Sequence, residues 1–125
     1  MRKRTICFDL DGTLANYDEG WQGTAVIGKP LARGARLLRE VFKTHRVIIY
    51  SCRGNPRLNS GHTEAELAKI IEEWFLKNDL PFDEIYTGLG KPVADAYVDD
   101  RAIEFNSCSN VQHALAKIRN LSPNE

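Results

Sequence analysis

The chain has 125 residues, of which 17 are basic and 17 acidic, and 42% are apolar. This length and apolar content suit one core, so we expect residues 1–125 to form a single domain. Because the charges cancel, no overall field draws the protein to nucleic acid or to an anionic membrane, and any anion must be bound locally. No stretch approaches the roughly 20 apolar residues that are needed to cross a bilayer.

The cysteines indicate a reducing compartment. Cys7, Cys52 and Cys108 are an odd number and lack the Cys-x-x-Cys spacing. Their number and spacing argue against a disulfide framework and against a zinc site. We therefore expect a cytoplasmic protein.

Apolar runs of strand and helix type alternate in the first half of the chain. Thr5 to Phe8 and the β-branched run Val47 to Tyr50 both have the form of buried strands. Between them we expect a helix with Pro30 at its first position. Its apolar positions at helical spacing are Leu31, Ala35, Leu38, Val41 and Phe42.

The second half continues this alternation. Thr63 and Glu66 form a capping-box pattern at the start of the clearest helix in the chain. Its apolar stripe consists of Leu67, Ile70, Ile71, Trp74 and Phe75. Short strands are expected at Glu84 to Thr87 and at Ala96 to Val98. A last helix should begin near Ser109 and bury Val111, Ala114, Leu115 and Ile118.

This order of elements predicts an α/β fold, a three-layer sandwich around a parallel sheet. If the first strand is central, the strand order is 3-2-1-4 and reverses beside that strand. Ligands of such sheets bind at the carboxyl ends of the strands, next to the reversal. Five polar residues fall at predicted strand ends: Asp9, Asp11, Ser51, Asp99 and Asp100.

Two acidic pairs follow two of these strands. Asp9 and Asp11 could simply form the turn that closes the first strand, and Asp99 and Asp100 could be a solvated strand end. Adjacent carboxylates repel each other, however, unless a proton or a cation neutralises them. Four carboxylates at one sheet edge favour a Mg²⁺ site, because Mg²⁺ prefers oxygen ligands and often joins carboxylates to a phosphate.

Other polar residues near these strand ends could contact a phosphate. Ser51 could donate its hydroxyl to a phosphoryl group or only cap the strand end. Lys91 could hold both the Asp9 carboxylate and a phosphoryl oxygen, or it could be solvated. Arg53, two residues after Ser51, is the best candidate for contacting substrate, with Cys52 beside it.

These residues resemble the four motifs of the haloacid dehalogenase (HAD) superfamily. Ile6 to Thr13 (ICFDLDGT) fits the first motif, and Val47 to Ser51 fits the second. Lys91 fits the third motif, and Asp99-Asp100 fits the fourth. The stretch Lys91 to Ala102 looks like that of small bacterial and phage members. The resemblance spans residues 6 to 100.

The resemblance implies a HAD-like Rossmannoid fold, phosphatase activity and the following mechanism. Asp9 would attack phosphorus, and Asp11 would protonate the leaving oxygen and then activate the water that hydrolyses the aspartyl phosphate. Mg²⁺ would be held by the Asp9 side chain, the Asp11 backbone carbonyl, and Asp99 or Asp100.

The intervals between the motifs leave no room for a separate cap domain, because residues 14–29 can form only a flap and residues 52–90 are taken up by a helix and a strand. The substrate would be a phosphorylated molecule, and a nucleic acid would serve only as a substrate that carries a terminal phosphate. Assembly into a homo-oligomer is left as an open alternative.

The alternative functions are a receiver-like regulatory domain and a non-catalytic phosphate-binding protein. The order of the acidic residues disfavours the receiver, and the complete set of motif residues disfavours the non-catalytic protein.

Overall fold

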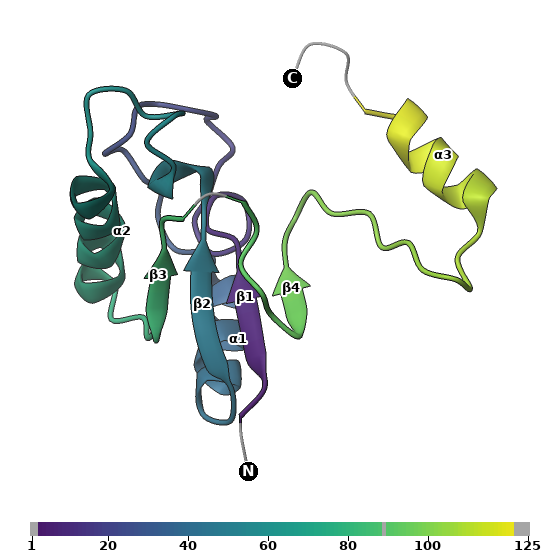
Figure 1. Ribbon diagram of the computed structural model, residues 1–125, viewed down its shortest axis with the longest axis horizontal. Helices are drawn as coiled ribbons and strands as arrows, with labels where there is room; N and C mark the ends of the chain where they lie inside the picture. Colours follow the sequence, from purple (N-terminus) through teal and green to yellow (C-terminus); the bar gives the residue numbers. More distant parts are fainter. Residues whose placement is uncertain (1–2, 89, 122–125) are drawn as a thin grey trace.

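Four parallel strands form the sheet at the centre of the molecule (Figure 1). The computed structural model describes residues 3–88 and 90–121. The strands are β1 (Thr5–Phe8), β2 (Arg46–Tyr50), β3 (Glu84–Tyr86) and β4 (Ala96–Val98), in the spatial order β3-β2-β1-β4. The predicted α/β class, the parallel sheet and the strand order 3-2-1-4 are confirmed.

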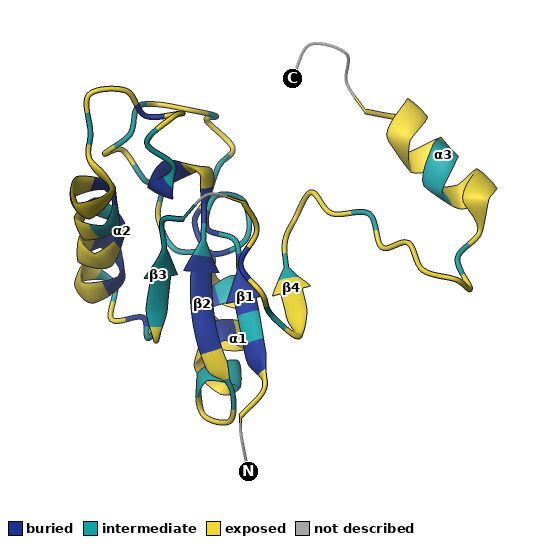
Figure 2. Cartoon of the chain, in the orientation of Figure 1, coloured by how far each residue is buried: buried dark blue, intermediate teal, exposed yellow. Residues whose placement is uncertain are grey.

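Two helices pack on one face of this sheet. The chain moves from β1 to β2 to β3 in one direction, so right-handed crossovers place α1 (Ala32–Phe42) and α2 (Glu64–Lys77) on the same side. Both helices share one hydrophobic cluster with the strands. Its buried members include Phe8, Leu38, Val47, Ile49, Ile71, Trp74 and Phe75. Figure 2 shows that burial concentrates on β1, on β2 and on the inner sides of the helices.

The segment that leads from β3 to β4 lies on the opposite face. Tyr97 stands opposite Cys7 in the register of β4 and β1, and its hydroxyl donates to the Pro92 carbonyl. Pro92 and Cys7 are both buried. The residues around Pro92 therefore lie against this face of β1 and β4.

The two helices of the core begin differently from each other. At α2 the predicted capping box is present: Glu66 N–H donates to Thr63 Oγ1, and Thr63 N–H donates to Glu66 Oε1. The start at Pro30 is wrong for α1, which begins at Ala32. Pro30 instead forms a β-bridge with Ala15, so its backbone joins the loop after β1.

The last helix, α3 (Val111–Arg119), contradicts its predicted burial. None of its residues is buried, and Val111 and Ile118 are 56% and 51% exposed. Figure 1 shows α3 standing away from the sheet. Its N-cap is Asn110 rather than Ser109, because the Asn110 side chain accepts from His113 N–H. A helical period predicts which side of a helix is apolar, but not whether a partner surface lies within reach.

Among the described residues, no helix is long and apolar enough to span a membrane.

Gly34 allows α1 to pack against the loop after β1, which gives a test of the fold. A Cβ at this position would lie 2.2 Å from the Thr13 carbonyl oxygen. Helix propensity alone predicts that Gly34→Ala stabilises the protein by about 1 kcal/mol. We expect the opposite sign, a loss of about 1–3 kcal/mol, because the clash is with backbone. Urea unfolding measures the difference, and an increase in stability would contradict the packing.

Candidate active site

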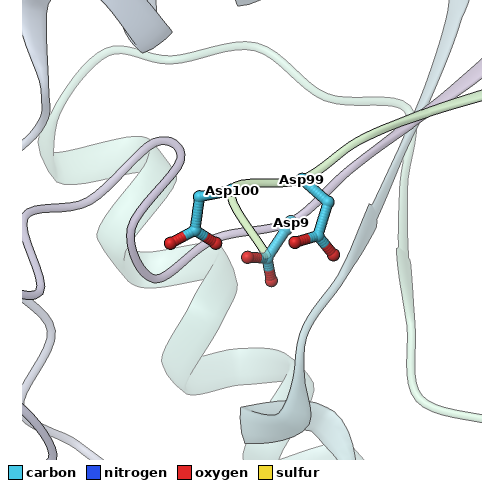
Figure 3. A group of neighbouring side chains, drawn as sticks. All are labelled: Asp9, Asp99 and Asp100. Atoms are coloured by element: carbon cyan, nitrogen blue, oxygen red, sulfur yellow. The ribbon is translucent and has the colours of Figure 1, made fainter. Parts of the chain in front are cut away.

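The carboxyl ends of β1 and β4 bring three carboxylates together (Figure 3). Asp9 follows β1, and its N–H donates to the Val98 carbonyl at the end of β4 (2.9 Å). Asp99 and Asp100 come next in the chain. Asp9, Asp99 and Asp100 each offer an oxygen, and these oxygens lie within 4.8 Å of one another. We call these three residues the acidic cluster.

Gly12 leaves space for one member of this cluster. Its φ is +86°, a conformation that favours glycine, and a Cβ there would lie 2.2 Å from Asp100 Oδ2. The Asp100 carboxylate therefore occupies space that any other residue at position 12 would fill. The glycine of the first motif is thus needed for the cluster as well as for the turn.

The electrostatics of the cluster show an unbalanced negative charge. The pKa of Asp9 is raised from 3.8 to about 7, first by burial and then by the charge of Asp99, with a smaller contribution from Asp100. A hydrogen bond from the Leu10 backbone acts in the opposite direction. A proton on Asp9 relieves this repulsion, and a hard divalent cation would relieve it as well. The three carboxylates are oxygen ligands of the kind that Mg²⁺ prefers, so the donor set fits this ion.

The structure does not bring the carboxylate of Asp11 into the acidic cluster. Its Oδ2 accepts a hydrogen bond from Arg53 Nε at 2.8 Å, within a buried ion pair. Its Oδ1 is buried and has no hydrogen-bond partner among the described residues. The sequence predicts a group of four carboxylates. The structure instead groups three of them, and the fourth, Asp11, is paired with Arg53.

Arg53 is turned into the protein instead of toward a substrate. Its side chain is 2% exposed, and four of its five N–H groups point at Asp11 and at the carbonyls of Gly23, Thr24 and Val26. The expected role in contacting substrate has no support in this geometry. Its neighbour Cys52 is exposed.

Ser51 and Lys91 both lie close to the strand ends. The buried Ser51 Oγ accepts from Arg53 N–H (3.1 Å) and caps the short 3₁₀ helix η1 (Cys52–Gly54). Within the described parts of the chain its hydroxyl proton has no acceptor. The Lys91 ammonium lies 3.8 Å from the centre of the Tyr97 ring. It forms no ion pair within the described part of the chain, so the predicted contact between Lys91 and Asp9 is not formed.

One buried polar residue near the site was not singled out from the sequence. Asn59 donates to the carbonyls of Cys52 (2.9 Å) and Asn55 (2.8 Å) and accepts from the Thr24 hydroxyl (3.0 Å). Asn59 stands among turn-forming residues, where asparagine is ordinary, so its sequence context held no signal. The pairing of Arg53 with Asp11 was missed for a similar reason, because 41 residues separate the two in the chain.

Comparisons with known proteins support the fold and go no further. No protein-family model and no curated protein matches this chain. A similar solved structure is the crystal structure of a structural-genomics target from Vibrio cholerae, which is 27% identical. The match covers 93% of this chain and 98% of that chain, with a TM-score of 0.56.

The raised pKa of Asp9 predicts how stability changes with pH when no metal is bound. Between its unfolded value of 3.8 and about 7, the folded protein binds more protons than the unfolded chain. Stability must therefore fall as pH rises through this window. In EDTA, the Tm of the wild type should fall more steeply than that of Asp9→Asn between about pH 5 and pH 8. Asp18→Asn, at an exposed acidic position, is the control, and identical slopes for all three proteins would contradict the shift.

Proposed function

We propose that this protein is a Mg²⁺-dependent phosphohydrolase of the HAD type, which cleaves phosphate monoesters through an aspartyl phosphate. One observation carries the proposal. Asp9 at the end of β1 meets Asp99 and Asp100 at the end of β4, beside the reversal of strand order. Ligands of open parallel sheets bind at this place, and the DxDGT pattern supplies the nucleophile there.

In this proposal Asp9 is the nucleophile. Its carboxylate forms a bond to phosphorus while the bond from phosphorus to the leaving oxygen breaks. Asp9, Asp99 and Asp100 would hold Mg²⁺, which when bound neutralises the carboxylates and the charge on the phosphoryl oxygens. Because Asp9 holds a proton up to about pH 7 in the metal-free protein, loss of that proton is part of forming the active site.

Asp11 is the general acid and base. It gives a proton to the leaving oxygen and then takes one from the water that attacks the aspartyl phosphate. Arg53 holds Oδ2, so Oδ1, which is buried without a partner among the described residues, is the oxygen left for proton exchange, and substrate binding must open a path to it. The separation of Asp11 from the acidic cluster suits this role, because a metal-bound carboxylate would be a poor proton donor.

The proposed substrate is a phosphate monoester with a bulky organic part. Ser51 would donate its hydroxyl to the phosphoryl group, and Lys91 would reach the group by leaving the Tyr97 ring. A cavity beside Ser51, lined among others by Asn55, Leu58 and Tyr86, has a volume of about 80 Å³, so a bulky organic part would extend beyond it. Residues 14–29 form loops and bridges, and the described residues form no separate cap.

Metal dependence is the first test of this function. Mg²⁺ should support hydrolysis of an aryl phosphate such as 4-nitrophenyl phosphate, and excess EDTA should abolish it. Binding to the folded state alone should also raise stability, by about 2.7 kcal/mol when Mg²⁺ is at a hundred times its Kd. Ca²⁺ and Zn²⁺ are the comparison ions. Full turnover after verified removal of metal would refute the proposal.

Replacing each of the two aspartates of the first motif should block the reaction at a different step. Asp9→Asn removes the nucleophile and a metal-binding carboxylate, so no phosphoenzyme should form. Asp11→Asn keeps the nucleophile but cannot exchange a proton, so turnover of an ester with a poor leaving group should fall by about 10²–10⁴-fold.

Acid-quench labelling separates the two variants. A good leaving group needs little protonation, so it should still phosphorylate Asp9 in Asp11→Asn, and that variant should hold more label than the wild type. Glu19→Gln, at an exposed acidic position, is the control for general charge effects. Label that maps to Ser51, or normal turnover in Asp9→Asn, would overturn the assigned roles.

A further inference from the structure

The guanidinium of Arg53 joins three parts of the chain that lie far apart in sequence. Arg53 itself follows β2. Its Nε donates to Asp11 Oδ2 (2.8 Å), whereas Nη1 donates to the carbonyls of Gly23 (2.9 Å) and Thr24 (2.8 Å). Nη2 donates to the Val26 carbonyl at 2.8 Å. One cation therefore holds both the acid–base residue of the proposed reaction and the loop formed by residues 20–28.

Burial makes these contacts dependent on one another. Arg53 is 2% exposed, and Asp11 is its one ion-pair partner among the described residues. A buried charge that loses its partner costs several kcal/mol, because water cannot replace the lost contact. If loop 20–28 moves away, three hydrogen bonds to the guanidinium are lost and water reaches it. The surroundings of Arg53 then no longer force it to stay paired with Asp11.

The loop is held on its outer side as well. The Trp21 ring, which is 50% exposed, lies over the Arg53 guanidinium at 4.6 Å and shields it from solvent. The Thr24 hydroxyl donates to Asn59 Oδ1 (3.0 Å), and Asn59 is itself anchored to the carbonyls of the loop after β2. Trp21 can be replaced without disturbing the hydrophobic core, because it is not part of that core.

We propose that Arg53 is a positioning residue that couples the docking of loop 20–28 to the orientation of Asp11. With the loop docked, Oδ2 of Asp11 is fixed by Arg53, which sets the direction of Oδ1. With the loop displaced, Asp11 loses that orientation while Asp9 and the metal-binding carboxylates keep theirs. The catalytic part of this inference rests on the proposed function, whereas the coupling of loop and carboxylate does not.

Coupling between two sites is reciprocal, which gives a test that needs no activity. Hydrogen exchange of the amides in residues 20–28 should become faster in Arg53→Lys, in Trp21→Ala and in Asp11→Asn. For Arg53→Lys we expect an increase of roughly tenfold to a hundredfold, the loss expected for hydrogen bonds to a charged group. Lysine keeps the positive charge, but its ammonium lacks the planar, forked set of N–H groups with which arginine donates to a carboxylate and three carbonyls at once.

Two controls separate this coupling from general destabilisation. Arg57→Lys makes the same chemical change at an exposed arginine nearby, and it should leave exchange in the loop unchanged. Amides in the middle of α2 report global opening, and exchange in the loop should increase by a larger factor than exchange of these amides in Arg53→Lys, Trp21→Ala and Asp11→Asn. If Arg53→Lys fails to fold, Trp21→Ala and Asp11→Asn still test the coupling. Unchanged loop exchange in both of these variants would overturn it.

A kinetic comparison tests the positioning of Asp11. Arg53→Lys should lower kcat/KM for an alkyl phosphate, whose poor leaving group needs a proton, by roughly tenfold to a hundredfold more than for 4-nitrophenyl phosphate. A purely structural role would lower both values by the same factor, and that result would overturn the positioning role.

The outcomes also separate the two proposals. A wild-type protein without phosphatase activity would refute the proposed function, and loop exchange would still decide the coupling. An active enzyme with unchanged loop exchange would refute the coupling alone.

Discussion

The convergence of two strand ends places three carboxylates against one another, and the rest of the site depends on this. Because β4 returns to the other side of β1, the chain that leaves β4 lies beside the chain that leaves β1. The hydrogen bond from Asp9 N–H to the Val98 carbonyl holds the two ends together. Repulsion within the acidic cluster raises the pKa of Asp9 and makes the site a receptor for a proton or a cation.

The negative charge of the carboxylates is compensated in two different ways. Asp11 has its own cation, the buried Arg53, and is not part of the acidic cluster. Asp9, Asp99 and Asp100 lack such a partner among the described residues and remain free to take a charge from outside. This division matches the proposed chemistry, in which one aspartate exchanges protons and the others surround a transferring phosphoryl group.

The loop after β1 contributes through its backbone more than through its side chains. It passes so close to α1 that position 34 has no space for a Cβ, and close enough to Asp100 that position 12 has none. Its later part offers three carbonyls to Arg53. A loop that binds through backbone carbonyls can vary in sequence at these positions and still keep its contacts, so long as its path is unchanged.

The sequence by itself determined the four strands, their order and the approach of Asp9 to Asp99 and Asp100. Apolar runs and capping patterns are local signals, and right-handed crossovers allow few topologies. Only the tertiary structure decided the partner of Asp11, the inward direction of Arg53 and the separation of α3 from the sheet. Each of these depends on which distant groups compete for a charge or an apolar surface, and neither spacing nor composition records that competition.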